Sequence, residues 1–209
     1  MKMFVLLAYV INYGLIIFFG VRKWRAGSFI TKALLTPILL MIYLAGAKEP
    51  KFPVVFALLF CFLGDIFLEY PKLFLPGLIT FWIGHIFYGI SFLSDIGAIS
   101  RLPWWLFLFA IIYVAYGIIF RTRFSVVDSK KKVAVTIYCG SILLVSFLSL
   151  LRAGSVTAYS FFMVLVGTLM FITSDSILAY NRFQKRSRNG GVWVMATYGA
   201  AQLMIILGI

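Results

Sequence analysis

Charged residues are scarce in this sequence. Only 12% of its 209 residues are Asp, Glu, Lys or Arg, whereas 63% are hydrophobic; soluble globular domains typically contain about 25% charged residues. This composition excludes a water-soluble fold. The chain also lacks linkers, low-complexity tracts and polar stretches long enough to bury a separate core. We therefore expect one integral membrane domain over residues 1–209.

Cysteine and histidine are nearly absent: the chain has two cysteines and one histidine. Cys61 and Cys139 fall inside apolar runs, which argues against a disulfide framework and a thiolate metal site. His85 has no clustered cysteines around it, so the usual tetrahedral zinc set cannot form, although Asp65, Asp175 and His85 supply three ligands in principle. We predict no metal and no cofactor.

Long apolar runs dominate what is present. A helix needs roughly 20 apolar residues to cross a hydrocarbon core about 30 Å thick, and the sequence supplies eight such runs. They lie at residues 3–21, 29–46, 54–70, 74–93, 103–120, 133–151, 157–180 and 192–208. The predicted fold is therefore all-α, a polytopic bundle of eight transmembrane helices. The first run has no convincing small-residue cleavage site, so we expect a retained helix rather than a signal peptide.

The net charge of +13 is distributed unevenly along the chain. Fourteen of the 19 basic residues fall in alternate connections, at residues 22–32, 72, 121–132 and 182–188, and the other five fall at the opposite helix ends. Basic connections stay in the cytoplasm, which places both termini on the non-cytoplasmic side. The pattern indicates membrane topology rather than nucleic-acid binding, and the compact chain suits a bacterial inner membrane.

Two aspartates lie within predicted membrane helices. An ionisable group at membrane depth costs at least a few kcal/mol, so it usually faces the bundle interior and marks a functional site. Asp65 and Asp175 each precede a predicted helix end by about five residues, or roughly 8 Å. We expect them at matching depth near the cytoplasmic side.

Several other polar side chains accompany the aspartates in the apolar runs. His85 and Tyr88 share one face of the fourth run, while Tyr198 and Gln202 share a face of the last. Each is a candidate for lining a polar cavity, and each fits equally well as a hydrogen-bonding link between helices. Lys32 and Glu69 lie near the cytoplasmic ends of their runs, where long side chains also reach the interface.

Four segments contain most of these polar residues: Leu63-Gly64-Asp65-Ile66-Phe67-Leu68, Gly84-His85-Ile86-Phe87-Tyr88, Ser174-Asp175-Ser176-Ile177-Leu178-Ala179 and Thr197-Tyr198-Gly199-Ala200-Ala201-Gln202. Together they resemble the successive signatures of the YhhN/TMEM86 family, the lysoplasmalogenases. Their order and spacing match across essentially the whole chain. One departure occurs at Thr31-Lys32-Ala33, where relatives tend to have Thr-Lys-Pro.

The resemblance implies an eight-helix enzyme that hydrolyses the vinyl-ether bond of lysoplasmalogens. The products are a fatty aldehyde and glycerophospho-ethanolamine or -choline. The expected partners are thus this lysophospholipid and the bilayer, with no obligatory protein partner and no nucleic acid.

This chemistry suits two acidic side chains. Protonation of the alkene carbon creates an oxocarbenium ion that water traps, a task resembling the two-carboxylate hydrolysis of glycosides. Two carboxyl groups in one apolar site can share a proton, so we expect Asp65 and Asp175 to form an acid/base pair, without knowing which is the acid. His85 or Tyr198 then orients the water. The predicted substrate-binding residues are Lys32, Glu69, Tyr88, Arg182, Tyr198 and Gln202, with Lys32, Arg182 or Lys72 holding the phosphate.

Three other readings account for some of these features. An intramembrane aspartyl protease also uses two aspartates, but its Gly-x-Gly-Asp context is broken by Phe62, and Ser174 precedes the second aspartate. A proton-coupled transporter uses buried acids and histidine equally well, although helices interrupted by Gly or Pro at corresponding positions are weak here. A lipid-binding membrane protein is the third alternative.

Overall fold

The computed structural model describes residues 2–97, 102–123, 129–185 and 187–209, with only the backbone described for Lys2, Ser129 and Lys130. Two residues of the predicted topology, Arg101 and Arg186, lie outside these ranges. Within them, eight helices are long and apolar enough to cross a membrane. The prediction of an all-α, eight-span fold is therefore confirmed.

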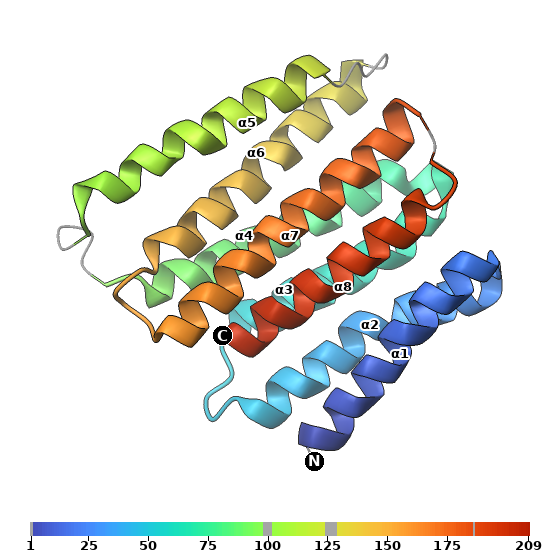
Figure 1. Cartoon of the computed structure of the whole chain (residues 1–209), viewed down its shortest axis with the longest axis horizontal. Coiled ribbons are helices and arrows are strands. Elements are labelled where there is room, and N and C mark those ends of the chain that lie inside the picture. Colours follow the sequence, from blue (N-terminus) through green and yellow to red (C-terminus); the bar gives the residue numbers. More distant parts are fainter. Residues whose placement is uncertain (1, 98–101, 124–128, 186) are drawn as a thin grey trace.

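The helices follow one another up and down the bundle (Figure 1). Short 3-10 turns precede two of them, η1 at Pro71–Leu73 and η3 at Trp104–Leu108. The main helices are α1 (Lys2–Arg22), α2 (Arg25–Gly46), α3 (Phe52–Glu69), α4 (Phe74–Asp95), α5 (Phe109–Arg123), α6 (Ser129–Leu151), α7 (Ala158–Phe183) and α8 (Gly190–Gly208).

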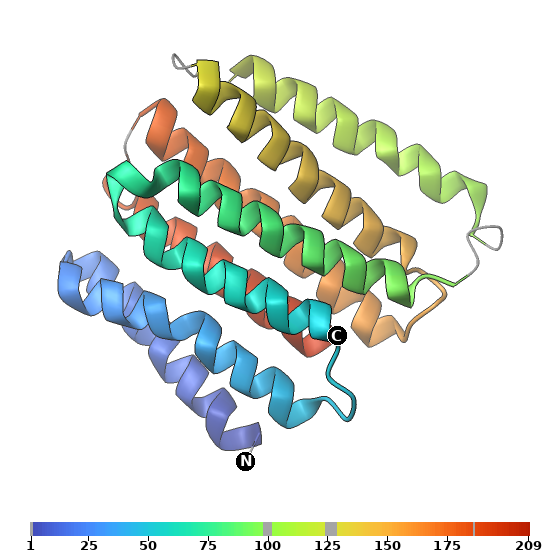
Figure 2. The same ribbon diagram turned by 180° about the vertical axis from the view of Figure 1, so that it is seen from behind.

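Six of these helices form a flattened ring. Contacts run from α2 through α3, α4, α6, α7 and α8 back to α2, with α2, α3 and α4 in one layer and α6, α7 and α8 in the other (Figures 1 and 2). Helix α1 packs against α2 and α8, whereas α5 lies at the edge of the bundle beside α6. Both termini lie at the same end of the bundle (Figure 1).

Small residues allow close contact between sequential helices. A Cβ atom on Gly84 would lie 3.1 Å from the carbonyl oxygen of Ala57 in α3, and one on Gly167 would lie 3.0 Å from the carbonyl oxygen of Ala201 in α8. Glycine at these positions lets the helix backbones approach, as is common in membrane helix pairs. The hairpins α3–α4 and α7–α8 therefore form two tightly packed walls.

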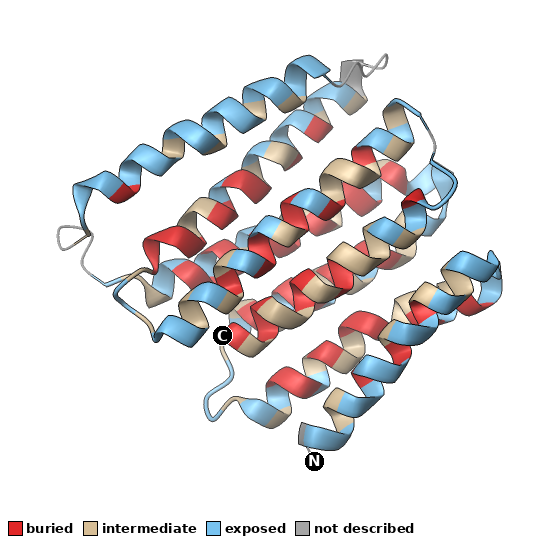
Figure 3. Cartoon of the chain, in the orientation of Figure 1, coloured by how far each residue is buried: buried red, intermediate tan, exposed pale blue. Residues whose placement is uncertain are grey.

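Buried residues face the inside of the ring, and the outer faces are exposed (Figure 3). Many large apolar side chains are on the outside, including Ile111, Ile118 and Val133, each more than half exposed. So extensive an apolar surface is unstable in water. The exposed belt is the face expected to contact lipid.

A buried ion pair closes the end of the bundle opposite the basic connections. Arg152 is 1% exposed, and its guanidinium donates to Asp95 over 3.0 Å and to Ser160 over 2.9 Å. Lys51 also pairs with Asp95, and Ser160 donates to the carbonyl of Gly208. Because these residues come from the ends of different helices, the network joins α4, α7 and α8 through one arginine.

The predicted helix end after Asp175 is wrong. Helix α7 continues to Phe183 rather than stopping at Tyr180, so Asp175 precedes its helix end by eight residues, whereas Asp65 precedes Glu69 by four. The apolar run sets only the part of a helix inside the bilayer. Polar residues can extend it further, and Arg182 in the last turn is favoured there by the helix dipole.

Candidate active site

Asp65 lies inside the ring at the end of a chain of hydrogen bonds. It is 2% exposed, and its Oδ2 accepts a 2.9 Å hydrogen bond from the Tyr198 hydroxyl of α8. Gln202 donates to Tyr198 over 3.3 Å, and Tyr88 of α4 donates to Gln202 over 2.7 Å. Each donor in this series points toward Asp65. The hydrogen bonds that begin at Tyr88 in α4 therefore end with the Tyr198 hydroxyl of α8 on a carboxylate oxygen of Asp65.

Tyr88 and Gln202, two of the predicted substrate-binding residues, lie behind Tyr198 in this series of hydrogen bonds. Both are buried, with exposures of 1% and 0%, and their polar atoms are engaged with each other. In this arrangement they support Tyr198, which contacts the acid directly. Gln202 lies one hydrogen bond further from Asp65 than Tyr198 does, and Tyr88 lies two further.

Asp175 is held in the same way from another helix. The Tyr138 hydroxyl of α6 donates a hydrogen bond to its Oδ2. Asp175 is partly exposed and borders a cavity of about 40 Å³. Arg182, Ser176 and Cys139 are among the other lining residues. The Asp175 carboxyl group therefore shares its cavity wall with the positively charged side chain of Arg182.

His85 lies between the two acid–tyrosine pairs. Its ring is 2% exposed and packs edge-on against Phe171, with centroids 4.7 Å apart, and against Tyr138, with centroids 5.4 Å apart. Neither ring nitrogen makes a hydrogen bond of good geometry within the described residues, although the backbone of Phe81, one turn earlier in α4, interacts with the ring. Because buried polar groups usually have well-formed hydrogen bonds, His85 retains capacity to bind a further polar group.

The two aspartates lie on opposite flanks of one aromatic cluster, which consists of Phe81, His85, Tyr138, Phe171 and Tyr198. Phe171 is the central ring, since it contacts His85 and lies 5.3 Å from the Tyr198 ring. The Asp65 and Asp175 carboxyl groups interact electrostatically. No hydrogen bond joins them in the described part of the chain, and Asp65 is not among the residues lining the Asp175 cavity.

The aspartates nevertheless lie at similar depth. Ser174, beside Asp175, donates to the carbonyl of Val194 over 3.0 Å, and Asp65 binds Tyr198, four residues further along the same helix. Four residues of helix span about 6 Å. The unequal helix ends described above therefore leave both acids near the same level of the bundle.

Lys32 and Glu69 pair with each other at the end of the bundle nearest Asp65. The Lys32 Nζ lies 3.1 Å from the Glu69 Oε1, and the Lys32 side chain is only 12% exposed. Asp65 lies one helical turn before Glu69 and also interacts electrostatically with Lys32. This ion pair joins α2 to α3 and places a cation close to the buried acid.

Arg182 lies on the other flank, near Asp175. Its guanidinium is 4.9 Å from the Phe74 ring centroid and donates to the carbonyl of Pro71 over 3.4 Å. Lys72, in the short turn η1, is exposed. The predicted cations thus divide between the two flanks, with Lys32 by Asp65 and Arg182 by Asp175.

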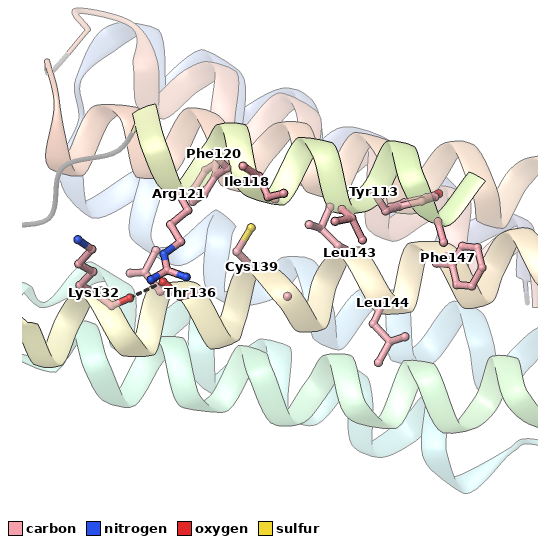
Figure 4. A pocket seen from close by; sticks show the side chains of 15 residues that line it. Tyr113, Ile118, Phe120, Arg121, Lys132, Thr136, Cys139, Leu143, Leu144 and Phe147 are labelled. Carbon is pink, nitrogen blue, oxygen red and sulfur yellow. Dashed lines mark hydrogen bonds between the residues drawn. The ribbon is translucent and has the colours of Figure 1, made fainter. Parts of the chain in front are cut away.

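A larger groove runs between α5 and α6 (Figure 4). Its volume is about 450 Å³, and its walls are mostly apolar, with Tyr113 and Phe147 toward one end and Arg121 and Lys132 at the other. Phe120, Val135 and Cys139 line both this groove and the small cavity at Asp175. The groove and the cavity are therefore neighbours that share a wall.

Three residues of this region were not singled out from the sequence. Tyr138 is one hydroxyl in an apolar run, with no neighbouring motif to distinguish it. Arg121 and Lys132 were counted only as topology charges, because nothing local shows that two helix ends place them on one groove. One sequence feature does point to Tyr138: an aspartate inside an apolar run needs a hydrogen-bond donor from another helix, and a tyrosine in an apolar run can supply one.

The possible metal ligands do not converge. Among the described residues, no group of three or more His, Cys, Asp or Glu side chains is arranged to hold a metal ion. Phe171 packs against His85 and against Tyr198, the tyrosine that binds Asp65.

Comparison with known proteins gives one family. The model of the YhhN family matches residues 27–209, which includes both aspartates, the aromatic cluster and the α5–α6 groove. No curated protein and no solved structure matches the chain.

Proposed function

Because the chain belongs to the YhhN family, we propose that it is a membrane hydrolase that cleaves the vinyl-ether bond of lysoplasmalogens. The substrate is lysoplasmenylethanolamine or lysoplasmenylcholine, and no cofactor takes part. The observation that carries the proposal is the pair of carboxyl groups inside the ring, each held by a tyrosine beside one aromatic cluster.

The reaction adds one water across a polarised double bond. A proton is transferred to the alkene carbon distal to the ether oxygen, leaving an oxocarbenium ion. Water adds to the cationic carbon and loses a proton, giving a hemiacetal. The hemiacetal then breaks its carbon–oxygen bond to the glycerol, releasing a fatty aldehyde and the glycerophospho-alcohol.

Asp175 is the proton donor in this proposal. It borders the cavity beside α6, so it can meet a substrate without displacement of the aromatic cluster. Tyr138 holds one carboxyl oxygen and leaves the other to carry the proton. A general acid must lie within hydrogen-bond reach of the atom it protonates, so the proposal requires the vinyl-ether end of the substrate to reach the cavity beside Asp175.

Asp65 supplies the second negative charge. With Tyr198 bound to one oxygen, its carboxylate is oriented within a water-poor interior, where a fixed charge stabilises a developing cation more strongly than in water. His85, whose ring nitrogens make no hydrogen bond of good geometry with other described side chains, is the group that orients the attacking water. Tyr88 and Gln202 hold Tyr198 in position by hydrogen bonds. Lys32 and Glu69 form an ion pair that places one positive and one negative charge beside Asp65.

Aldehyde release tests the proposal directly. Purified protein in lipid nanodiscs is incubated with lysoplasmenylcholine, and free aldehyde is measured. We expect turnover by the natural sequence, and loss of at least about 100-fold in Asp65→Asn and Asp175→Asn, since general acid–base groups contribute about 10²–10⁴-fold. Unchanged thermal unfolding shows that both variants remain folded.

Two results would contradict the proposal. Full activity in either variant removes that aspartate from the mechanism. Folded natural-sequence protein that releases no aldehyde, yet drives proton-dependent solute uptake into vesicles, identifies a transporter that uses the same buried acids.

A further inference from the structure

The groove between α5 and α6 has the dimensions of a binding site for one lipid chain. Its volume of about 450 Å³ falls in the range of ligand pockets, roughly 300–1,000 Å³. Along α5 its lining runs from Ala110 to Arg121, or roughly 16 Å of helix. That is about half of a 30 Å hydrocarbon core, the depth spanned by the chain of one lipid.

The groove exists because α5 packs loosely beside the ring. Helix α5 contacts mainly α6 and η3, and nearly all its described residues are partly or fully exposed. On the α6 side, a Cβ atom at Gly140 would have nothing within 4 Å. Val114 and Leu144, which line the groove, are 60% and 56% exposed, so the groove opens onto the lipid-facing surface.

One end of the groove is cationic. Arg121, near the end of α5, points across the groove toward Thr136 of α6, and Lys132 lies beside it (Figure 4). Neither forms an ion pair with a described acidic residue. An apolar groove with two cations at one end is complementary to a hydrocarbon chain that ends in a phosphate.

The groove also leads toward Asp175. Phe120, Val135 and Cys139 separate it from the Asp175 cavity and line both. Along α6, Lys132 precedes Tyr138, the tyrosine that binds Asp175, by six residues, or roughly 9 Å. The cationic end of the groove and the tyrosine that binds Asp175 are therefore less than two helical turns apart on α6.

We propose that the α5–α6 groove binds a single-chain lysophospholipid from the bilayer, with Arg121 and Lys132 contacting the phosphate. The chain lies along Gly140 and the apolar walls, and the ether oxygen faces the wall shared with the Asp175 cavity. The inference rests on the proposed function for its choice of an ether lysophospholipid. It assigns the phosphate to Arg121 and Lys132 in place of Lys32, which is already paired with Glu69.

Photolabelling with a lipid that cannot be hydrolysed tests the site apart from catalysis. The probe is a saturated alkyl-ether lysophosphatidylcholine with a diazirine on its chain, added to the full chain in phosphatidylcholine nanodiscs. We expect adducts on peptides of α5 and α6, and competition by unlabelled lysophosphatidylcholine but not by equal amounts of added phosphatidylcholine. Labelling elsewhere, or equal competition by the two-chain lipid, overturns the proposal.

Two variants, each with a matched control, sharpen the test. Arg121→Gln combined with Lys132→Gln should lower probe affinity about tenfold, the loss typical of one charge-assisted hydrogen bond, whereas Arg123→Gln, outside the lining, should not. Gly140→Leu fills the groove and should block labelling, whereas Gly14→Leu, which also has nothing within 4 Å of its Cβ, should not. Unaffected labelling in both groove variants also overturns the proposal.

The two proposals fail separately. If the natural sequence releases aldehyde but the probe labels another surface, the groove assignment is wrong and the hydrolase stands. If the probe labels the groove and no aldehyde is released from lysoplasmenylcholine, the hydrolase is wrong and the lysophospholipid site stands.

Discussion

Asp65 and Asp175 show how a carboxyl group is accommodated at membrane depth. Each accepts a hydrogen bond from a tyrosine of another helix, Tyr198 for Asp65 and Tyr138 for Asp175. Tyrosine suits this role because its ring packs among apolar side chains while its hydroxyl remains available as a donor. At this scale, the position of each acid depends on a single phenolic hydroxyl.

Removing either hydroxyl should reduce turnover without unfolding the protein. A hydrogen bond to a charged group contributes about 1.5–3 kcal/mol and one between neutral groups about 0.5–1.5 kcal/mol, and each 1.36 kcal/mol corresponds to about tenfold in rate. We therefore expect kcat for aldehyde release to fall about 10- to 100-fold in Tyr198→Phe, whose hydroxyl binds the Asp65 carboxylate. The fall should be about 2- to 10-fold in Tyr138→Phe, whose hydroxyl binds the protonated Asp175.

Tyr43→Phe is the matched control for these variants. Tyr43 is also buried and hydrogen-bonded, but its hydroxyl accepts from the backbone N–H of Lys51, at the end of the bundle away from the acids. Its kcat should stay close to that of the natural sequence. Equal losses in all three variants would mean that the tyrosines contribute only to general stability.

At the scale of the helices, close contacts and loose contacts have different roles. The α7–α8 hairpin packs closely through Gly167, which keeps Asp175 and Tyr198 at similar depth. Helix α5, by contrast, packs loosely on α6, although Tyr116 also shares a hydrogen bond with Ser176 of α7. The tight wall holds Asp175 and Tyr198, both proposed to take part in catalysis, and the loose helix leaves the space proposed for lipid.

A side chain at Gly167 should separate α7 from α8. A Cβ there meets the backbone of Ala201 and Ile205 at 3.0–3.1 Å, and overpacking typically costs about 1–3 kcal/mol. At about 2–4 °C per kcal/mol for a chain of this length, Gly167→Leu should lower Tm by several degrees in detergent, followed by tryptophan fluorescence. Gly14→Leu is the control, and equal Tm values in the two variants would refute close packing at Gly167.

At the scale of the whole molecule, the fold places both termini at one end and the basic connections at the other (Figure 1). The described basic residues at the latter end include Arg22, Lys72 and Lys185. Because basic connections are retained in the cytoplasm, we expect the end with Asp65 and Asp175 to face the cytoplasmic side, and the Arg152–Asp95 network to face the other.

Cysteine accessibility in intact cells tests this orientation. In a chain carrying Cys61→Ser and Cys139→Ser, a membrane-impermeant maleimide should label Lys48→Cys, between α2 and α3, and should not label Lys185→Cys, after α7. Both positions are exposed, so both should react once the cells are permeabilised. Labelling of Lys185→Cys alone in intact cells would reverse the predicted topology.

The sequence by itself determined the number of membrane helices, their approximate bounds and the presence of the two aspartates inside them. These properties are local, since a helix crosses the bilayer if its own residues are apolar over sufficient length. The end of α7 was misplaced because hydropathy does not report helical turns beyond the bilayer.

Only the tertiary structure decided which side chains meet. It showed that Tyr138 binds Asp175 while the His85 ring nitrogens make no hydrogen bond of good geometry with other described side chains, that Tyr88 engages Gln202, and that α5 leaves a groove on α6. These contacts depend on the rotation of each helix about its axis and on which helices are neighbours. Both are set by packing among residues far apart in the chain, and no local pattern encodes them.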